Sequence, residues 1–166
     1  MRTKTIVIGS LFAAMAALFQ LIPVFFSEFL IFLTIFSAVP IYIVSRINPK
    51  AGILSYFVAS MIVMTLSVHE GLFFLCTNGI VGLSLGICSN YTKKKSIIWL
   101  LSSIILTISL SIMNYGIGIP VFGGKIPGVI TIQIGIIFLV STIYNIFYYY
   151  FSNFIFKIVQ KPLRNY

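Results

Sequence analysis

Long runs of apolar residues, separated by short polar or glycine- and proline-containing breaks, divide the chain into six segments. Each run is about as long as a helix that crosses the hydrocarbon core of a bilayer, which takes roughly 20 residues. The runs do not show the ten-residue alternation that is typical of a membrane β-barrel. We therefore predict an all-α integral membrane bundle, a single domain over residues 1–166, with transmembrane helices over residues 5–26, 29–45, 51–68, 71–91, 96–115 and 129–150.

The composition agrees with this class. Hydrophobic residues make up 60 % of the 166 residues and charged residues only 8 %, which is too few charges to cover the surface of a soluble domain.

After the sixth run, Phe151, Phe154, Ile155 and Ile158 recur at helical spacing, with Lys157 among them and Lys161 just after them. This pattern predicts a C-terminal helical extension at the membrane interface, which serves either as an anchor or as a docking surface.

The basic residues predict the orientation. With six helices, ten of the eleven Lys and Arg residues fall on one side of the membrane, and only Lys125 falls on the other. Because cytoplasmic loops carry the excess of Lys and Arg, we expect both termini in the cytoplasm of a multi-pass protein, most simply in a bacterial plasma membrane. The formal charge of +9 then reports topology and attraction to anionic membrane lipid. It does not indicate a nucleic-acid partner, since there is no soluble basic face.

The residues that usually carry catalysis are scarce. The chain has no Asp, one His and two Glu, so we expect no catalytic residues, no metal site, no cofactor and no enzymatic activity. Cys76 and Cys88 lie 12 residues apart in one apolar run, too far for a disulfide within one straight helix. Both acids lie near helix ends, whereas a proton-driven transporter usually has an ionisable group deep in the membrane. Energy for any transport would therefore come from another subunit.

Polar side chains gather in the outer half of the predicted bundle. Amides inside a bilayer are costly unless they are paired. They either bond between helices or converge on an outward-facing pocket, whose titratable rim would allow a cationic or polar ligand. The inner half has fewer candidates, chiefly Tyr144 and Asn145. The candidate substrate-binding residues are Gln20, Glu28, His69, Glu70, Asn78, Asn114, Tyr115 and Gln133.

Glycine, alanine and proline are concentrated in one predicted loop and on two of the predicted helices. The glycine- and proline-rich loop over residues 114–129 is either a lid over the pocket or a connector. In the fourth run, Gly79, Gly82 and Gly86 predict close internal packing against another helix. In the first run, Gly9, Ala13 and Ala17 recur every four residues and form a flat band. That band either packs inside the bundle or serves as a docking face for a partner.

The alanine pair of the first run also opens a longer resemblance. Ala13-x-x-x-Ala17 begins the chain, and SAVPIYIVSRINPKAGILSYFVAS follows with a proline-bearing helix, a short basic turn and a glycine-led helix. The stretch GLFFLCTNGIVGLSLGI then supplies a glycine-rich fourth helix. In these features, over most of its length, the chain resembles the substrate-binding S component of an energy-coupling factor (ECF) vitamin transporter.

The resemblance implies a function and a set of partners. An S component is the substrate-capturing membrane subunit of an ECF-type ABC importer and binds a vitamin or a related small nutrient from outside. It docks on a separate transmembrane coupling subunit, and two ATPase subunits drive release of the substrate inside. By this resemblance Ala13 and Ala17 are docking residues, with Gly9 on the same band.

Two other interpretations remain open from the residues alone. A multi-pass membrane scaffold, such as a rod-shape-determining protein of the MreD type, has a similar length and helix count. Its polar groups would join helices and line no pocket. A third interpretation is a membrane protein that binds lipid or a hydrophobic small molecule without ECF partners. The scaffold and the importer subunit differ in one feature: only in the importer subunit do the outer amides face a single cavity.

Overall fold

The computed structural model describes residues 3–26, 28–121, 123–124 and 129–163, with the backbone alone for residues 3, 4, 28 and 160–163. Within these ranges every regular element is a helix. In chain order the elements are α1 (Thr3–Phe25), η1 (Glu28–Ser37), α2 (Ala38–Ile47), α3 (Pro49–Leu66), α4 (Val68–Cys76), α5 (Asn78–Tyr91), α6 (Lys95–Ser111), η2 (Ile112–Ile117) and α7 (Ile130–Leu163).

Six stretches of the described chain are long and apolar enough to cross a membrane. The prediction of an all-α membrane bundle with six spans is therefore confirmed. Three of the spans are composite, because η1 continues into α2, α4 into α5, and α6 into η2. The six spans are Thr5–Phe25, Phe29–Ile47, Pro49–Leu66, Val68–Tyr91, Lys95–Ile117 and Ile130–Val159.

Side-chain caps explain two of the tight turns between spans. The Asn48 side chain accepts hydrogen bonds from the backbone N–H groups of Lys50 and Ala51, at 3.1 and 3.3 Å, and Pro49 occupies the first turn of α3. At the opposite end of α3, Ser67 caps α4 by accepting from the backbone N–H of Glu70 at 3.4 Å. Both arrangements satisfy backbone donors that have no partner inside a helix.

The second and fourth spans change character part-way. In the second, a 3₁₀ helix becomes α-helical at Ala38, so Pro40 lies in the first turn of α2, where the loss of its N–H costs least. In the fourth, the helix breaks at Thr77, whose backbone leaves the helical region with φ −122° and ψ −93°. The Thr77 hydroxyl donates to the carbonyl oxygen of Phe73. The break places Asn78 at the start of a new helix, not in the middle of one as the sequence predicted.

Glycines bring α5 against α2, as predicted. A Cβ atom added at Gly82 would lie 2.3 Å from the carbonyl oxygen of Ala38, and one added at Gly86 would lie 2.7 Å from that of Tyr42. At both positions only hydrogen fits between the two backbones. The largest buried cluster surrounds this contact and includes Tyr42, Leu85 and Tyr148.

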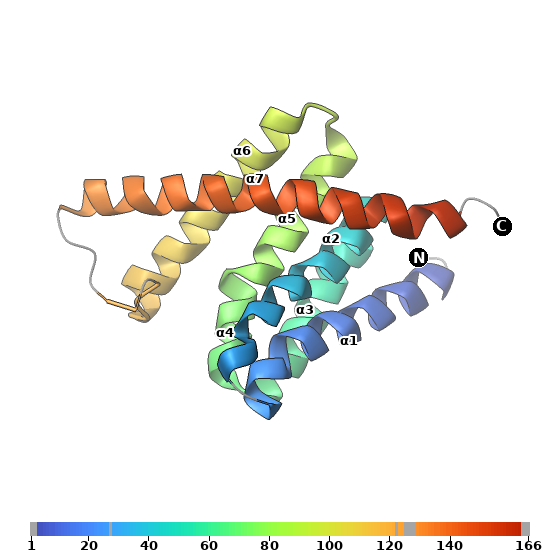
Figure 1. Ribbon diagram of the computed structural model, residues 1–166, viewed down its shortest axis with the longest axis horizontal. Helices are drawn as coiled ribbons and strands as arrows, with labels where there is room; N and C mark the ends of the chain where they lie inside the picture. Colours follow the sequence, from blue (N-terminus) through green and yellow to red (C-terminus); the bar gives the residue numbers. More distant parts are fainter. Residues whose placement is uncertain (1–2, 27, 122, 125–128, 164–166) are drawn as a thin grey trace.

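Helix α7 is a single long rod. Its 34 residues span about 50 Å at roughly 1.5 Å per residue, more than the ~30 Å thickness of a bilayer core. Figure 1 shows α7 crossing in front of α5, with the start of α1 and the end of α7 both toward the right-hand end of the view. The predicted sixth span and C-terminal extension are therefore one continuous helix. Near its start, α7 is mostly exposed up to Ile137.

An arginine fastens the far end of α7 to the bundle. Nη1 of Arg46, on α2, donates to the Tyr42 hydroxyl at 2.6 Å and to Oδ1 of Asn153 at 2.7 Å. Its guanidinium also lies 4.2 Å from the centre of the Phe156 ring, a cation–π contact. The carbonyl oxygen of Arg46 accepts from Asn90 Nδ2 at 2.7 Å. The guanidinium of Arg46 thus holds the extension of α7 to α2, and the backbone carbonyl of the same residue links α2 to α5.

The small-residue band of α1 faces into the bundle. Ala13 and Ala17 are 0 % and 2 % exposed, and the carbonyl oxygen of Gly9 accepts from the Ser55 hydroxyl on α3 at 2.9 Å. The structure therefore gives these three residues partners inside the bundle, and docking through them stays a prediction. Small side chains let α1 approach α3 closely, and this contact covers the band. Internal packing is the alternative that the structure adopts.

Candidate functional site

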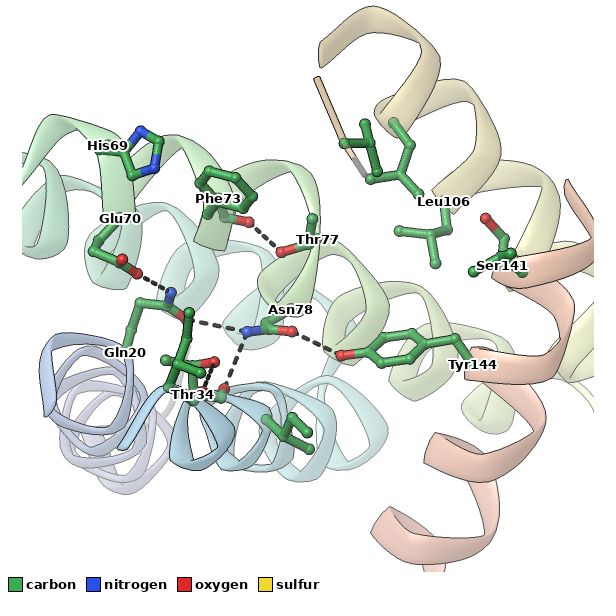
Figure 2. A pocket seen from close by; sticks show the side chains of 15 residues that line it. Gln20, Thr34, His69, Glu70, Phe73, Thr77, Asn78, Leu106, Ser141 and Tyr144 are labelled. Carbon is green, nitrogen blue, oxygen red and sulfur yellow. Dashed lines mark hydrogen bonds between the residues drawn. The ribbon is translucent and has the colours of Figure 1, made fainter. Parts of the chain in front are cut away.

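A cavity of about 330 Å³ lies at the end of the bundle opposite the chain termini. Residues from α1, η1, α4 and α5 form one wall, and residues from α6, α7 and the loop between them form the other (Figure 2). Of the fifteen described residues that line it, seven have apolar side chains and eight carry a polar group. The lining residues are Gln20, Ile31, Thr34, Ile35, His69, Glu70, Phe73, Thr77, Asn78, Leu106, Leu110, Val121, Val140, Ser141 and Tyr144.

Gln20 is the centre of a hydrogen-bond network on the first wall. Its side-chain Nε2 donates to Oε2 of Glu70 at 2.7 Å, and its Oε1 accepts from the Ser37 hydroxyl at 3.0 Å and from Asn78 Nδ2 at 3.2 Å. Gln20 is only 2 % exposed. The network therefore satisfies an amide that would otherwise be costly inside a membrane protein.

Asn78 carries the network to the second wall. Its Nδ2 also donates to the backbone oxygen of Thr34 at 3.1 Å, and its Oδ1 accepts from the Tyr144 hydroxyl at 2.9 Å. Figure 2 shows the result as an unbroken line of side chains from Glu70 through Gln20 and Asn78 to Tyr144. Four separate helices are linked by these three contacts.

The carboxylate at one end sets the direction of every bond in this line. An ionised carboxylate only accepts, so Gln20 presents its NH₂ group to Glu70 and its oxygen to Asn78. Asn78 then presents its own oxygen to the Tyr144 hydroxyl, which donates. All the protons in the line point toward Glu70.

The rim of the cavity combines a carboxylate with an aromatic group. The His69 ring packs edge-on against Phe73, with 4.7 Å between ring centres, and forms no ion pair with Glu70. Among the described residues that line the cavity, none is Lys or Arg. The carboxylate of Glu70 therefore faces the cavity with an amide as its side-chain partner and no opposite charge.

The structure brings together four of the eight predicted binding residues and separates three. Gln20, His69, Glu70 and Asn78 all line the cavity. Tyr115 donates to Oε1 of Gln133 at 2.6 Å in an exposed pair away from the cavity. Asn114 Oδ1 accepts from the backbone N–H of Val121 at 3.4 Å. The side chain of Glu28, the eighth predicted residue, lies outside the described residues.

Those three residues do not line the cavity. The sequence prediction places them there by their depth in the membrane and their polarity, but neither determines which way a side chain points. Helix α6 ends in the π-helical turn η2, which terminates at Gly118 with a positive φ of 81°. This turn directs Tyr115 toward the start of α7 instead. Of the described part of the loop that follows, Val121 contributes to the cavity wall.

Sequence reasoning missed Tyr144, Ser141, Thr34 and Thr77 as cavity residues. The sequence predicts Tyr144 in the inner half of the bundle. In the structure its hydroxyl bonds to Asn78, which follows the break in the fourth span, so Tyr144 joins the network. One signal was available: Ser141 and Tyr144 are three residues apart on α7 and share one face of that helix.

Within the described ranges, no three His, Cys, Asp or Glu side chains come together to hold a metal ion. Comparison with protein-family models, with curated proteins and with solved structures finds no match for this chain. The geometry of the cavity is therefore the observation from which a function can be inferred.

Proposed function

We propose that this protein captures a small nutrient molecule in the cavity at the outer end of the bundle, as the substrate-binding membrane subunit of an ECF-type importer. The observation that carries the proposal is the convergence of Gln20, Glu70, Asn78 and Tyr144 on a single cavity of about 330 Å³. Small-molecule sites usually have this character, with apolar walls and a few well-placed polar groups, and volumes of roughly 300–1,000 Å³.

The placement of the cavity supports capture from outside. Glu70 and His69 lie at the start of α4, and the basic residues Arg46, Lys50 and Lys93 lie at the other end of the bundle. By the positive-inside rule the basic end is cytoplasmic. The cavity then faces the outside, and both chain termini face the cytoplasm.

A groove between α1 and α3 is where we propose that the coupling subunit docks. The groove has a volume of about 160 Å³, and Gly9 and Ala13 contribute to its lining although both are buried. Its rim is more open, since Ser10 is exposed and Leu54 is 53 % exposed. The resemblance to S components, in which this part of the first helix docks, supports a coupling subunit and two ATPase subunits as partners.

A scaffold of the MreD type is the second candidate, and one observation favours it. Each of the two amides in the network is satisfied by other side chains or backbone groups of the protein, as helix-joining polar groups would be. The cavity beside them favours ligand capture, because a scaffold has no need for an open space lined by eight polar residues.

Affinity purification followed by native mass spectrometry tests the proposal. The protein is extracted from its native membrane in mild detergent, and both co-purifying proteins and released small molecules are identified. A bound small molecule together with an ATPase pair and a membrane coupling subunit supports the importer subunit. An empty protein that co-purifies with cell-wall or cytoskeletal components supports the scaffold and rejects the importer.

Ser10→Trp tests the docking groove separately. The new ring would fill the groove from its exposed edge without entering the packed α1–α3 contact. We expect the ATPase pair to be lost from the purified complex while the bound small molecule is retained. Leu139→Trp, at an exposed position of α7, is the control and should keep both. An ATPase pair that stays with the Ser10→Trp protein would place the docking face elsewhere.

A further inference from the structure

We infer that the ligand of this cavity is a small organic cation, with a protonated nitrogen at Glu70 and an apolar body against the facing wall. The inference rests on the proposed function, because it assumes that the cavity holds a ligand. It starts from the charge of Glu70, which has no opposite charge beside it in the described lining of the cavity.

Burial makes an uncompensated carboxylate costly. Glu70 is half-buried at the cavity wall, and Gln20 Nε2 is the described side-chain donor that reaches it. One amide N–H occupies one carboxylate oxygen, Oε2, and leaves most of the acceptor capacity of the group unused. A charged group that loses water without gaining a charged partner is destabilised. A ligand with a positive nitrogen would supply that partner each time it binds.

The direction of the hydrogen-bond network points to the same class. Since every proton in the line points toward Glu70, the Gln20 and Asn78 oxygens are both taken by donors within the protein. The Tyr144 hydroxyl donates its hydrogen bond to Asn78, so toward a ligand it can only accept one. The Thr77 hydroxyl likewise donates its hydrogen bond to the Phe73 carbonyl oxygen. The cavity therefore offers acceptors at both ends, which suit a ligand that carries N–H or O–H donors.

The rest of the wall suits an apolar body. Phe73, Leu106 and Leu110 line the cavity. Figure 2 shows Phe73 on the same side of the space as Glu70, and Leu106 on the opposite wall near Ser141. An aromatic face beside a carboxylate is a common environment for an organic ammonium group, since both attract positive charge. A carboxylate or phosphate ligand would meet a like charge at Glu70 and acceptor oxygens at Tyr144 and Thr77.

Three probes of similar size and different charge test the inference. The probes are 2-phenylethylamine, 2-phenylethanol and 3-phenylpropionate, and binding to the purified full-length protein is measured by titration calorimetry. We expect the amine to bind about tenfold or more tightly than the alcohol, and the acid to bind most weakly. Equal affinity for the amine and the alcohol, or preference for the acid, would overturn the cationic class while leaving the cavity as a ligand site.

Variants of Glu70 show whether the preference comes from this charge. Glu70→Gln keeps an acceptor for Gln20 Nε2, so the network and the unfolding temperature should change little, but the preference for the amine over the alcohol should disappear. Glu70→Asp keeps the charge and should keep most of the preference. A preference that survives in Glu70→Gln would show that another group recognises the amine, and would overturn the role of Glu70.

The molecule carried by the native protein separates this inference from the proposed function. A released molecule with a basic nitrogen supports both, even where none of the three probes binds. A released molecule without such a nitrogen keeps the capture function and overturns the cationic class. A protein that carries no small molecule and binds none of the probes refutes the proposed function itself.

Discussion

The Tyr144 hydroxyl on α7 donates a 2.9 Å hydrogen bond to Oδ1 of Asn78 on α5. The two residues are 66 positions apart in the chain. This bond joins the second wall of the cavity to the network of the first wall, and its direction follows from Glu70 at the far end of the line. It is therefore the contact by which the α6–α7 side of the bundle is tied to the candidate site.

Tyr144→Phe should weaken both the fold and the site. The substitution removes the donor and leaves Oδ1 of Asn78, which is 7 % exposed, without its partner. A buried polar group that loses its partner costs about 1–3 kcal/mol. We expect a lower free energy of unfolding, measured by thermal denaturation in detergent, and weaker retention of the bound small molecule. Tyr91→Phe, at a position that is 79 % exposed, is the control and should leave both unchanged.

Gly82→Ala should destabilise the contact between α5 and α2. The added methyl group would lie 2.3 Å from the carbonyl oxygen of Ala38, so the two helix backbones would have to separate. Overpacking of this kind costs about 1–3 kcal/mol. Gly135→Ala is the control, because a methyl group there meets no atom within 4 Å. We expect a lower unfolding temperature for the first variant and an equal or higher one for the second, and the reverse order would contradict the packing.

Ala13→Leu should destabilise the protein as a whole. Ala13 is fully buried in a cluster with Ile41, Tyr56 and Phe74, so three more carbon atoms would crowd these side chains. We expect a loss of about 1–3 kcal/mol of unfolding free energy. The control is Ala14→Leu, the same substitution at an exposed position of the same helix. A stable Ala13→Leu protein that loses only its partner subunits would restore Ala13 as a docking residue.

Arg46→Met should release the end of α7 from the bundle. It removes the donor to Asn153 and to the Tyr42 hydroxyl, and the cation beside Phe156. Hydrogen bonds from a charged group contribute about 1.5–3 kcal/mol. We expect faster trypsin cleavage after Lys157, which is exposed on α7, measured by the rate at which the C-terminal fragment appears. Lys50→Met, an exposed cation near the same end, should leave that rate unchanged.

The band of small residues on α1 acquires a different meaning in the structure. Gly9, Ala13 and Ala17 lie on the same face of α1 as Gln20 and bring that face against α3. At the end of this close contact, Gln20 reaches Glu70 and Asn78. The spacing of the small residues indicated a flat face, but spacing alone does not show whether the face is covered by the same chain or by another.

The number of spans was accessible from the sequence because it depends on a local property, the length of each hydrophobic run. The helix ends were less accessible, since the third helix starts at Pro49 and the fourth at Val68, before the predicted starts at 51 and 71. The break at Thr77 was less accessible. The surrounding residues are as apolar as those of an unbroken helix, so the run from Val68 to Tyr91 reads as one element.

The sequence by itself determined that this chain is a six-span helical membrane protein with its basic residues mainly at one end and both of its acids at the other. Hydrophobic length and charge placement act on each segment separately, so they can be read along the chain. The tertiary structure alone decided that Gln20, Glu70, Asn78 and Tyr144 form one line beside one cavity while Tyr115 and Gln133 pair elsewhere. Hydrogen bonds have a range of about 3 Å, so the partners of a polar group depend on how helices distant in sequence pack and turn against one another.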